Sequence, residues 1–298
     1  MTILKTTNLK KRFGNVIALD GVDLEVNRGE VYGFIGPNGA GKTTTIRILL
    51  GILQPDEGKA TVFGKDAWQD AVEIHKKIAY VPGEVNLWPN LSGGEVIDFF
   101  VKLRGSNNKN HRKELIEKFD LDPSKKCRSY SKGNRQKVAL VAAFAAEADL
   151  YILDEPSSGL DPLMEKAFQE CVMDIKKAGK SIFLSSHILS EVEKLCDKVS
   201  IIRKGKIIEA GTLDELRHLT RTIIRLKTKE EIPALDEVKG VYDIKKTNNN
   251  TYTFQVDTDN IGDIVKYFSQ SGILKLESTP PKLENLFMHH YKKNGGVS

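Results

Sequence analysis

Gly36-Pro37-Asn38-Gly39-Ala40-Gly41-Lys42-Thr43 is the stretch that decides the fold, because it matches the pattern G-x-x-x-x-G-K-[ST]. An apolar segment, Val31 to Ile35, precedes it and predicts a buried strand. A segment rich in Ile and Leu follows it and predicts a helix. A Gly-rich turn that carries a lysine by chance is the alternative. We favour a phosphate-binding loop, since the motif and both flanking elements agree.

The residue types of this loop suit a nucleotide. Its glycines let the backbone turn N–H groups toward phosphate oxygens, and the helix N-terminus adds a partial positive charge. Lys42 is expected to reach the β and γ phosphates, the Thr43 hydroxyl to ligate Mg²⁺, and Thr44 to bind the α phosphate. The predicted nucleotide-binding residues are Gly36, Pro37, Asn38, Gly39, Ala40, Gly41, Lys42, Thr43 and Thr44.

Two acidic residues end a second apolar segment, Leu150 to Leu153. A nucleotide bound at the loop needs a carboxylate near its metal ion and a group that orients the attacking water. Asp154 is predicted to hold Mg²⁺ through water, and Glu155 to act as general base. Ordinary loop carboxylates are the alternative, and the upstream phosphate loop argues against it.

The composition limits what else the chain does. Its 298 residues, 40% of them hydrophobic, suffice for one large domain and a smaller one. The longest apolar run, Val138 to Ala146, is too short to span a bilayer, and Met1 to Asn8 lack a secretory pattern. The three cysteines form no Cys-x-x-Cys pair. The net charge of +5 is spread over 45 basic and 40 acidic residues, so no nucleic acid is expected as a partner.

The order of elements predicts an α/β core over residues 1–215. Short β-branched segments followed by helical patterns, such as Ser181 to Ser185, indicate a buried parallel sheet. Val199 to Ile202 and Ile207 to Glu209 are typical of a hairpin, and Thr212 to Glu215 of a capping box that begins a helix.

Residues 220–298 are predicted to form a small α+β accessory domain. Its expected elements are strands at Thr222 to Leu226, Val241 to Lys245 and Tyr252 to Val256, a turn at Asn248 to Asn250, a helix at Ile261 to Ser271, and an amphipathic stretch at Leu283 to Tyr291. The pair His289-His290 is more typical of a surface than of a metal site.

In the order and spacing of these motifs, residues 3–215 resemble the ATP-binding subunits of ABC transporters. The resemblance implies a P-loop NTPase core with a helical subdomain at about residues 86–146. Tyr130-Ser131-Lys132-Gly133 occupies the place of the family's signature, with Ser131 23 residues before Asp154. In that family, a signature serine and glycine complete the ATP site of a second subunit. The resemblance therefore implies a homodimer with ATP at its interface, contacted by Ser131 and Gly133.

A second segment, Leu91-Ser92-Gly93-Gly94-Glu95, looks more like the written form of that signature. It lies too early, however, with Ser92 62 residues before Asp154. Ser92 with Glu95 three residues later, before an apolar run, is typical of a helix capping box. We therefore interpret this segment as structural.

Three further site residues follow from the resemblance. Asp161, in Ser158-Gly159-Leu160-Asp161, matches the aspartate that couples the two sites, and His187 matches the histidine near the γ phosphate and the catalytic water. Phe13 resembles the aromatic residue that stacks on adenine, and a core phenylalanine at a strand end is its alternative.

One position departs from the family. Gly83-Glu84 stands where the family normally has a glutamine that contacts Mg²⁺ or water, so Glu84 is the candidate metal-contacting residue. The helical subdomain is expected to touch the membrane protein, with Leu87, Trp88 and Pro89 as candidate contacts.

The resemblance implies an ATP-hydrolysing subunit at the cytoplasmic face of the membrane that energises a separate transmembrane permease. The lysine in the signature, Gly83-Glu84 and the ending Pro281 to Phe287 look most like bacterial drug or peptide-antibiotic exporters. One alternative is an ABC ATPase that acts on ribosomes or DNA, although the chain has a single phosphate loop and no sustained heptads. Another is a nucleotide-gated regulatory module with little turnover, which the missing glutamine keeps open.

Overall fold

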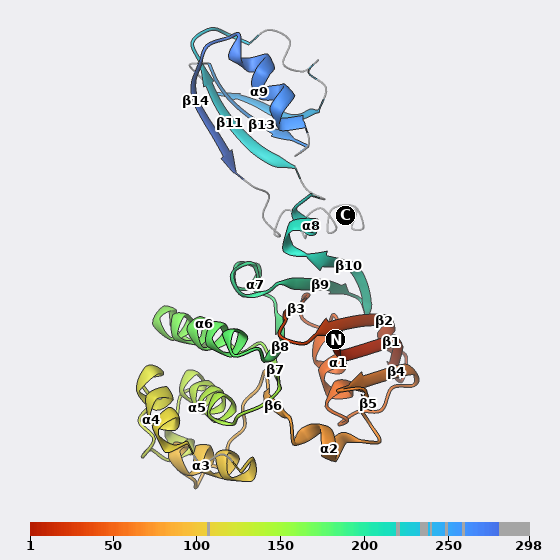
Figure 1. The fold of residues 1–298 in the computed structure, drawn as a ribbon, viewed down its shortest axis with the longest axis vertical. Helices are drawn as coiled ribbons and strands as arrows, with labels where there is room; N and C mark the ends of the chain where they lie inside the picture. Colours follow the sequence, from red (N-terminus) through yellow and green to blue (C-terminus); the bar gives the residue numbers. More distant parts are fainter. Residues whose placement is uncertain are drawn as a thin grey trace. The chain divides into compact units, whose positions relative to one another are not determined.

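The computed structural model describes residues 1–105, 108–218, 221–232, 238, 240–247, 250–257 and 260–279. The chain forms two compact units, Met1–Ala210 and Gly211–Ser298 (Figure 1). The predicted fold class, an α/β core of the P-loop type with a further small unit of strands and a helix, is confirmed.

A six-stranded sheet forms the centre of the first unit. Its order is β10 (Lys206–Thr212), β9 (Lys198–Arg203), β3 (Val31–Ile35), β8 (Ser181–Ser186), β7 (Leu150–Asp154) and β6 (Ile78–Val81). The strands from β9 to β6 pair in parallel. Every residue of β3, β7 and β8 is buried, which explains why their apolar residues come in unbroken runs, such as Leu150 to Leu153 and Ile182 to Leu184, rather than at alternating positions.

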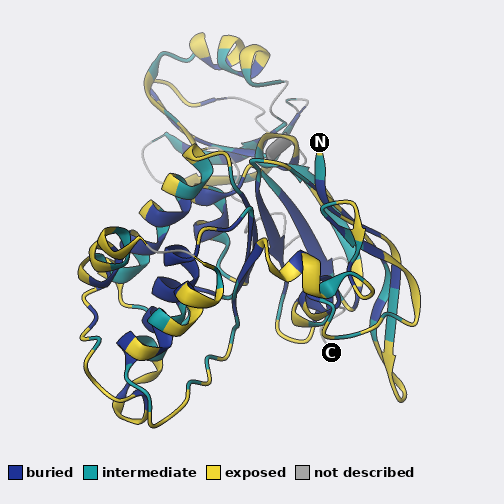
Figure 2. Cartoon of the chain, turned by 60° about the horizontal axis from the view of Figure 1, so that its bottom comes forward, coloured by how far each residue is buried: buried dark blue, intermediate teal, exposed yellow. Residues whose placement is uncertain are grey.

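Helices pack around this sheet and close the core. They are α1 (Lys42–Leu49), α2 (Ala71–His75), α6 (Pro162–Lys177) and α7 (Leu189–Leu195). Figure 2 shows the buried residues concentrated in the sheet and on the helix faces turned toward it. In this core the rings of Phe34 and Phe183, from the neighbouring strands β3 and β8, lie 5.4 Å apart. Burial of such side chains is the main stabilising contribution.

A second, antiparallel sheet lies in the first unit and was not predicted. Its order is β2 (Val16–Asn27), β1 (Thr2–Phe13), β4 (Glu57–Val62) and β5 (Lys65–Asp66). The pairing of β1 with β2 is interrupted by four register shifts. Each shift breaks the two-residue alternation that marks a half-buried strand in a sequence.

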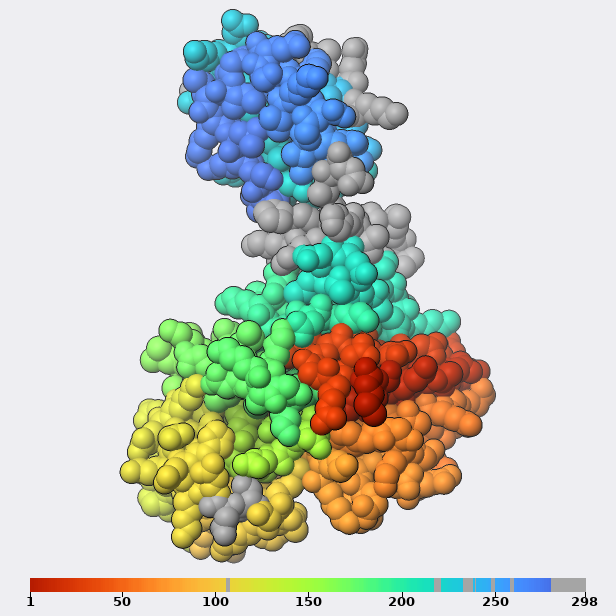
Figure 3. Space-filling model, in the orientation of Figure 1, coloured from red at the N-terminus to blue at the C-terminus, as the bar shows by residue number. Residues whose placement is uncertain are grey.

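The segment predicted as a helical subdomain contains α3 (Gly93–Leu103), α4 (Lys109–Lys118), the short 3₁₀ helix η1 (Cys127–Ser129) and α5 (Lys132–Ala145). Figure 3 shows it as a lobe of the first unit, coloured yellow to light green. The capping box at Ser92 is confirmed. Glu95 N donates to Ser92 Oγ at 3.2 Å, and Ser92 N donates to Glu95 Oε2 at 2.6 Å.

The second unit begins with α8 (Leu213–His218), where Thr212 and Glu215 form the predicted reciprocal cap. Its antiparallel sheet has the order β12 (Val241–Thr247), β13 (Thr251–Val256), β11 (Thr222–Thr228) and β14 (Ile273–Thr279). Helix α9 (Ile261–Ser269) packs on it, with the rings of Phe254 and Phe268 5.2 Å apart.

Strand β14 was not predicted. Asn248 and Asn249, the stretch 283–291 with His289-His290, and the ending Pro281 to Phe287 lie outside the described residues.

The cap of α3 gives a first testable prediction. Ser92→Ala should lower the free energy of unfolding by about 1 kcal/mol, because the N–H of Glu95 loses its acceptor. In a domain of this size, that corresponds to a fall in Tm of about 2–4 °C. Ser92→Thr, which keeps the hydroxyl, is the matched control and should melt close to the wild type. A loss of ATP hydrolysis in Ser92→Ala, at a temperature where it is folded, would contradict the structural role of this segment.

Candidate nucleotide-binding site

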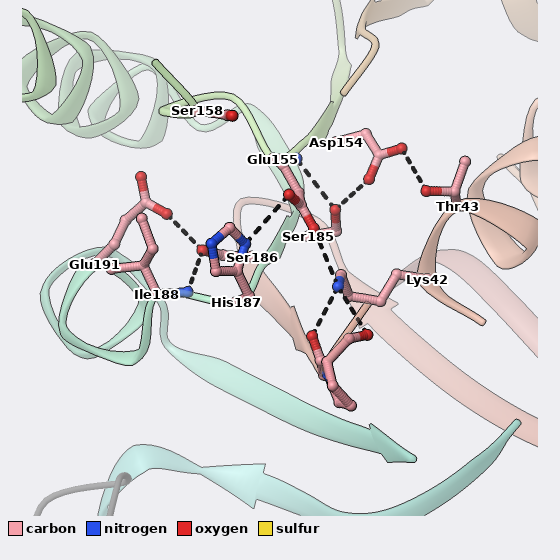
Figure 4. Close-up of polar contacts among 12 residues, drawn as sticks. Lys42, Thr43, Asp154, Glu155, Ser158, Ser185, Ser186, His187, Ile188 and Glu191 are labelled. Atoms are coloured by element: carbon pink, nitrogen blue, oxygen red, sulfur yellow. Dashed lines mark hydrogen bonds and ion pairs between the residues drawn. The ribbon is translucent and has the colours of Figure 1, made fainter. Parts of the chain in front are cut away.

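The parallel register of three strands assembles the site (Figure 4). Ile35, the last residue of β3, pairs with Ser186 at the end of β8, and Asp154 at the end of β7 pairs with Ser185. The segments that follow these strands therefore leave the sheet at the same edge. Ligands of open α/β sheets bind outside this carboxyl edge.

The phosphate loop connects β3 to α1. Helix α1 begins at Lys42, and its N-cap Gly41 has φ = 114°, a conformation that residues with a Cβ atom rarely adopt. Lys42 is buried, with 5% of its side chain exposed. Its Nζ donates to Gly36 O at 2.7 Å and to Pro37 O at 3.2 Å, and it lies 3.1 Å from Glu155 Oε1. The loop thus holds a desolvated ammonium group at the sheet edge.

Asp154 and Thr43 form the oxygen-rich part of the site. The Thr43 hydroxyl donates to Asp154 Oδ2 at 3.0 Å, and the Ser185 hydroxyl donates to Asp154 Oδ1 at 2.5 Å. A hydroxyl and a carboxylate are ligands that Mg²⁺ prefers. Among the described residues, no group of three or more His, Cys, Asp or Glu side chains is suited to a metal ion. Thr43 and Asp154 supply two oxygen ligands, which suits a cation that phosphate oxygens also coordinate.

Glu155 lies between a lysine and a histidine. Its backbone has φ = 48°, in the left-handed region, and its N–H donates to Ser185 O at 3.0 Å. Its carboxylate approaches Lys42 on one side, and Oε2 lies 3.2 Å from His187 Nδ1 on the other. The structure thus brings together Lys42, Thr43, Asp154, Glu155 and His187, all of which the sequence analysis singled out.

Ser131, Gly133 and Asp161 gather at a different place in the first unit. Ser131 is the N-cap of α5, and Asp161 is the N-cap of α6, accepting from two backbone N–H groups at 3.0 Å. Gly133 packs so closely on Gly159 that a Cβ atom there would lie 2.5 Å from Gly159 O. In the described part of the chain, no contact joins these three residues to Lys42 or Thr43.

Phe13 is not a core residue, so that alternative is wrong. The ring ends β1 and is 50% exposed, with Lys11 Nζ 5.7 Å from its centroid. Asp56 fixes the preceding residues, since it accepts from Lys11 Nζ at 2.7 Å and from the backbone N–H of Arg12 at 2.6 Å. The hydrogen bond from Lys11, followed by that from Arg12, lowers the pKa of Asp56.

Glu84 is exposed, and its side chain has no described contact with Thr43 or Asp154. Its neighbour Gly83 is the residue that lies against Asp154, and a Cβ atom on Gly83 would be 3.5 Å from Asp154 Oδ2. Sequence reasoning missed Ser185, although the two serines that end an otherwise apolar strand were a visible signal.

A strand, a Gly-rich loop and a helix, with a lysine, a threonine and two carboxylates at one sheet edge, define a P-loop nucleotide-binding protein. The family described as "ABC transporter" matches residues 19–158. A bacitracin transport ATP-binding protein of Bacillus licheniformis is 33% identical over 96% of this chain and 96% of its own length. The chain therefore belongs to the family of ABC transporter ATP-binding proteins, which hydrolyse ATP to power transport.

Two further similarities extend the comparison. A daunorubicin resistance ATP-binding protein of Streptomyces coeruleorubidus is 36% identical over 72% of this chain and 70% of its own length. A solved dimeric ATP-binding cassette, in a post-hydrolysis state with ADP and Pi, matches with a TM-score of 0.65. That match covers 71% of this chain and 99% of the other at 22% identity, so it shows the fold alone. In the described ranges, no helix is both long and apolar enough to cross a membrane.

The pKa of Tyr80 leads to a prediction about the stability of the fold at alkaline pH. Burial, followed by the charge of Asp154, raises the pKa of Tyr80 on β6 from 10.0 to about 12. In the unfolded chain the phenol of Tyr80 has its usual pKa of 10.0, and in the folded chain its pKa is about 12. The stabilisation from this difference is therefore fully present below pH 10 and is lost as pH rises toward 12. Tyr80→Phe should therefore flatten the fall in unfolding free energy across this range, as measured by denaturant titration. An equal wild-type-to-variant difference at pH 9 and pH 11 would contradict it.

Proposed function

We propose that two copies of this chain bind two ATP molecules at a shared interface and hydrolyse them to drive a separate membrane permease that exports a drug or peptide antibiotic. The observation that carries the proposal is the contact of Glu155 with both Lys42 and His187, beside the Thr43–Asp154 pair. In this proposal Glu155 is the base, Lys42 the phosphate-binding cation, and Thr43 with Asp154 the metal-ligand pair, and the contacts among them at one edge of the sheet support these roles.

The chemistry is the hydrolysis of the terminal phosphoanhydride bond. A water oxygen forms a bond to the γ phosphorus, the bond to the bridging oxygen of ADP breaks, and Glu155 accepts the proton of the water. Lys42 neutralises charge on the β and γ phosphates, and His187 orients the water and the γ phosphate. Thr43, and Asp154 through water, would hold Mg²⁺, which would supply charge neutralisation of the phosphate oxygens.

A composite site, formed by residues of two copies of the chain, accounts for Ser131, Gly133 and Asp161, which do not contact Lys42. Ser131 caps α5, and an N-terminal end of a 14-residue helix favours an anionic ligand. Since neither Ser131, Gly133 nor Asp161 contacts the phosphate loop in the described chain, we assign them to the nucleotide of a second copy. Thr44 binds the α phosphate, and the exposed ring of Phe13 stacks on adenine.

We infer that transport is outward from the names of the relatives. Their names refer to bacitracin transport and to daunorubicin resistance, and removal of a toxic compound is the simplest route by which an ATP-binding protein confers resistance. We therefore place the chain at the cytoplasmic face of the membrane, bound there through its permease.

The helical subdomain offers a surface for that permease. A cavity of about 280 Å³ lies among the end of β6, the loop 85–88, α3 and α5. The exposed rings of Trp88, Phe99 and Phe100 form one cluster, with Trp88 and Phe99 5.6 Å apart. Arg104 also lines the cavity, and its Nη1 is buried without a hydrogen-bond partner. Aromatic residues and arginine are the types that dominate binding energy at interfaces. Trp88 was a sequence candidate, and Arg104 was not.

The composite site is tested by trapping the dimer. Glu155→Gln should bind ATP but hydrolyse it at least about a hundredfold more slowly, because an amide accepts no proton from water. The ATP-bound variant should then elute as a stable dimer in size-exclusion chromatography. Lys42→Ala is the control, since it should abolish nucleotide binding and with it the ATP-dependent dimer. Glu155→Gln that stays monomeric at saturating ATP would refute the composite site.

The docking surface is tested with the two tryptophans. Trp88→Ala should reduce co-purification with the permease about tenfold or more, because an aromatic anchor is removed from the cavity. Trp68→Ala is the matched control, as Trp68 is 44% exposed, against 51% for Trp88, but does not line the cavity. The measurement is recovery of the integral membrane protein in mild detergent. Equal recovery for both variants would contradict docking at Trp88, and recovery of ribosomes instead would favour the non-transport alternative.

A nucleotide-gated module with little turnover is the second candidate, favoured by the exposed Glu84 and by Gly83 beside Asp154. The turnover of the purified wild-type chain separates the two functions. Steady hydrolysis that Glu155→Gln abolishes supports the transport ATPase. The absence of hydrolysis, in the presence of the permease, supports the module.

A further inference from the structure

Glu191 is a buried carboxylate beside the site that the proposed reaction does not use. It lies on α7 and is 5% exposed. Its Oε2 accepts from the Ser186 hydroxyl at 2.8 Å, and that hydroxyl oxygen accepts from the backbone N–H of Ile188 at 2.9 Å (Figure 4). Ser186 and Ile188 are the residues on either side of His187. This hydrogen-bond chain therefore fixes the backbone turn from which His187 extends.

Glu191 also lies near the loop that follows Glu155. A hydrogen bond from the buried Ser157 hydroxyl is one of the causes that lower the pKa of Glu191, and Ser157 is two residues after Glu155 in the sequence. The carboxylate thus holds the segment of His187 through Ser186 and lies near the segment of Glu155. The side chains of Glu155 and His187 themselves lie 3.2 Å apart.

The buried surroundings of Glu191 disfavour the charged form of its carboxyl group. Burial raises the pKa of Glu191 above its usual value, the hydrogen bonds from Ser186 and Ser157 and the neighbouring His187 oppose the rise, and Glu165 adds to it. A buried carboxyl group destabilises a fold unless it is hydrogen-bonded, and the Ser186 hydroxyl donates to it here. A hydrogen-bonded core carboxylate with no role in the reaction is the alternative explanation, and the position of Ser186 directly before His187 argues against it.

We propose that Glu191 is a positioning residue for ATP hydrolysis, which holds Ser186 and the turn beside it in place so that His187 faces Glu155. It does not touch the nucleotide. The inference rests on the proposed roles of Glu155 and His187. Misplacement of a reacting group by about 1 Å is enough to slow catalysis about a hundredfold, so a positioning contact of this kind has a measurable effect.

The test separates turnover from binding. Glu191→Ala should lower kcat about 10- to 100-fold while the Kd for ATP stays within about twofold, because the phosphate loop is untouched. Glu191→Gln should restore most of the turnover, since its amide oxygen can still accept from the Ser186 hydroxyl. Glu165→Gln is the control, a neighbouring carboxylate on α6 without a described bond to Ser157 or Ser186, and it should leave kcat unchanged.

A double-mutant cycle identifies the route of the effect. Ser186→Ala should lower kcat by itself, and the pair Glu191→Ala with Ser186→Ala should be little worse than the more severe single variant, because both changes remove one interaction. Thermal melting establishes that each variant is folded at the assay temperature. If Glu191→Ala does not fold, Ser186→Ala, which removes only a hydroxyl, carries the test.

Four results would overturn the inference: wild-type kcat in Glu191→Ala, loss of ATP affinity in step with kcat, additive effects in the cycle, or wild-type kcat in Ser186→Ala. A wild-type chain without turnover would instead reject the proposed ATPase function, so the two failures are distinguishable.

Discussion

The pairing of β3, β8 and β7 in parallel register is the constraint on which the site depends. Because Ile35 lies opposite Ser186 and Asp154 opposite Ser185, three segments far apart in the sequence leave the sheet together. A slip of one residue in either pairing would exchange the two faces of a strand and turn its terminal side chains away. The buried apolar residues of these strands therefore fix the alignment of the polar groups beyond them.

Features with a local cause were predictable from the sequence. The phosphate loop, the buried strands and the caps at Ser92 and Thr212 each follow from residues within a few positions of one another. The α/β class followed from the alternation of such segments. Glu155 was singled out because two acidic residues end an apolar segment downstream of a phosphate loop, and His187 because of motif order; their proximity appears only in the structure, and their catalytic roles remain predictions.

Features that depend on distant partners were not predictable. Register shifts obscured the pattern of β1 and β2, and β14 has little burial of its own, so neither showed a clear alternation. The contacts of Ser185 with Asp154 and of Glu191 with Ser186 exist only because strands and helices converge at the sheet edge. The exposure of Phe13 is likewise set by the end of β1, whose geometry Asp56 fixes from 44 residues away along the chain.

The close approach of Gly133 to Gly159 has a mechanical consequence. Main-chain atoms meet there with no side chain between them, so no rotamer change can absorb a displacement. A shift at the first turn of α5 must be transmitted to the loop after Glu155 within the same polypeptide. In the dimer proposed above, this rigid junction would connect the first turn of α5, assigned there to the nucleotide of the second copy, to the loop after Glu155 of the same copy.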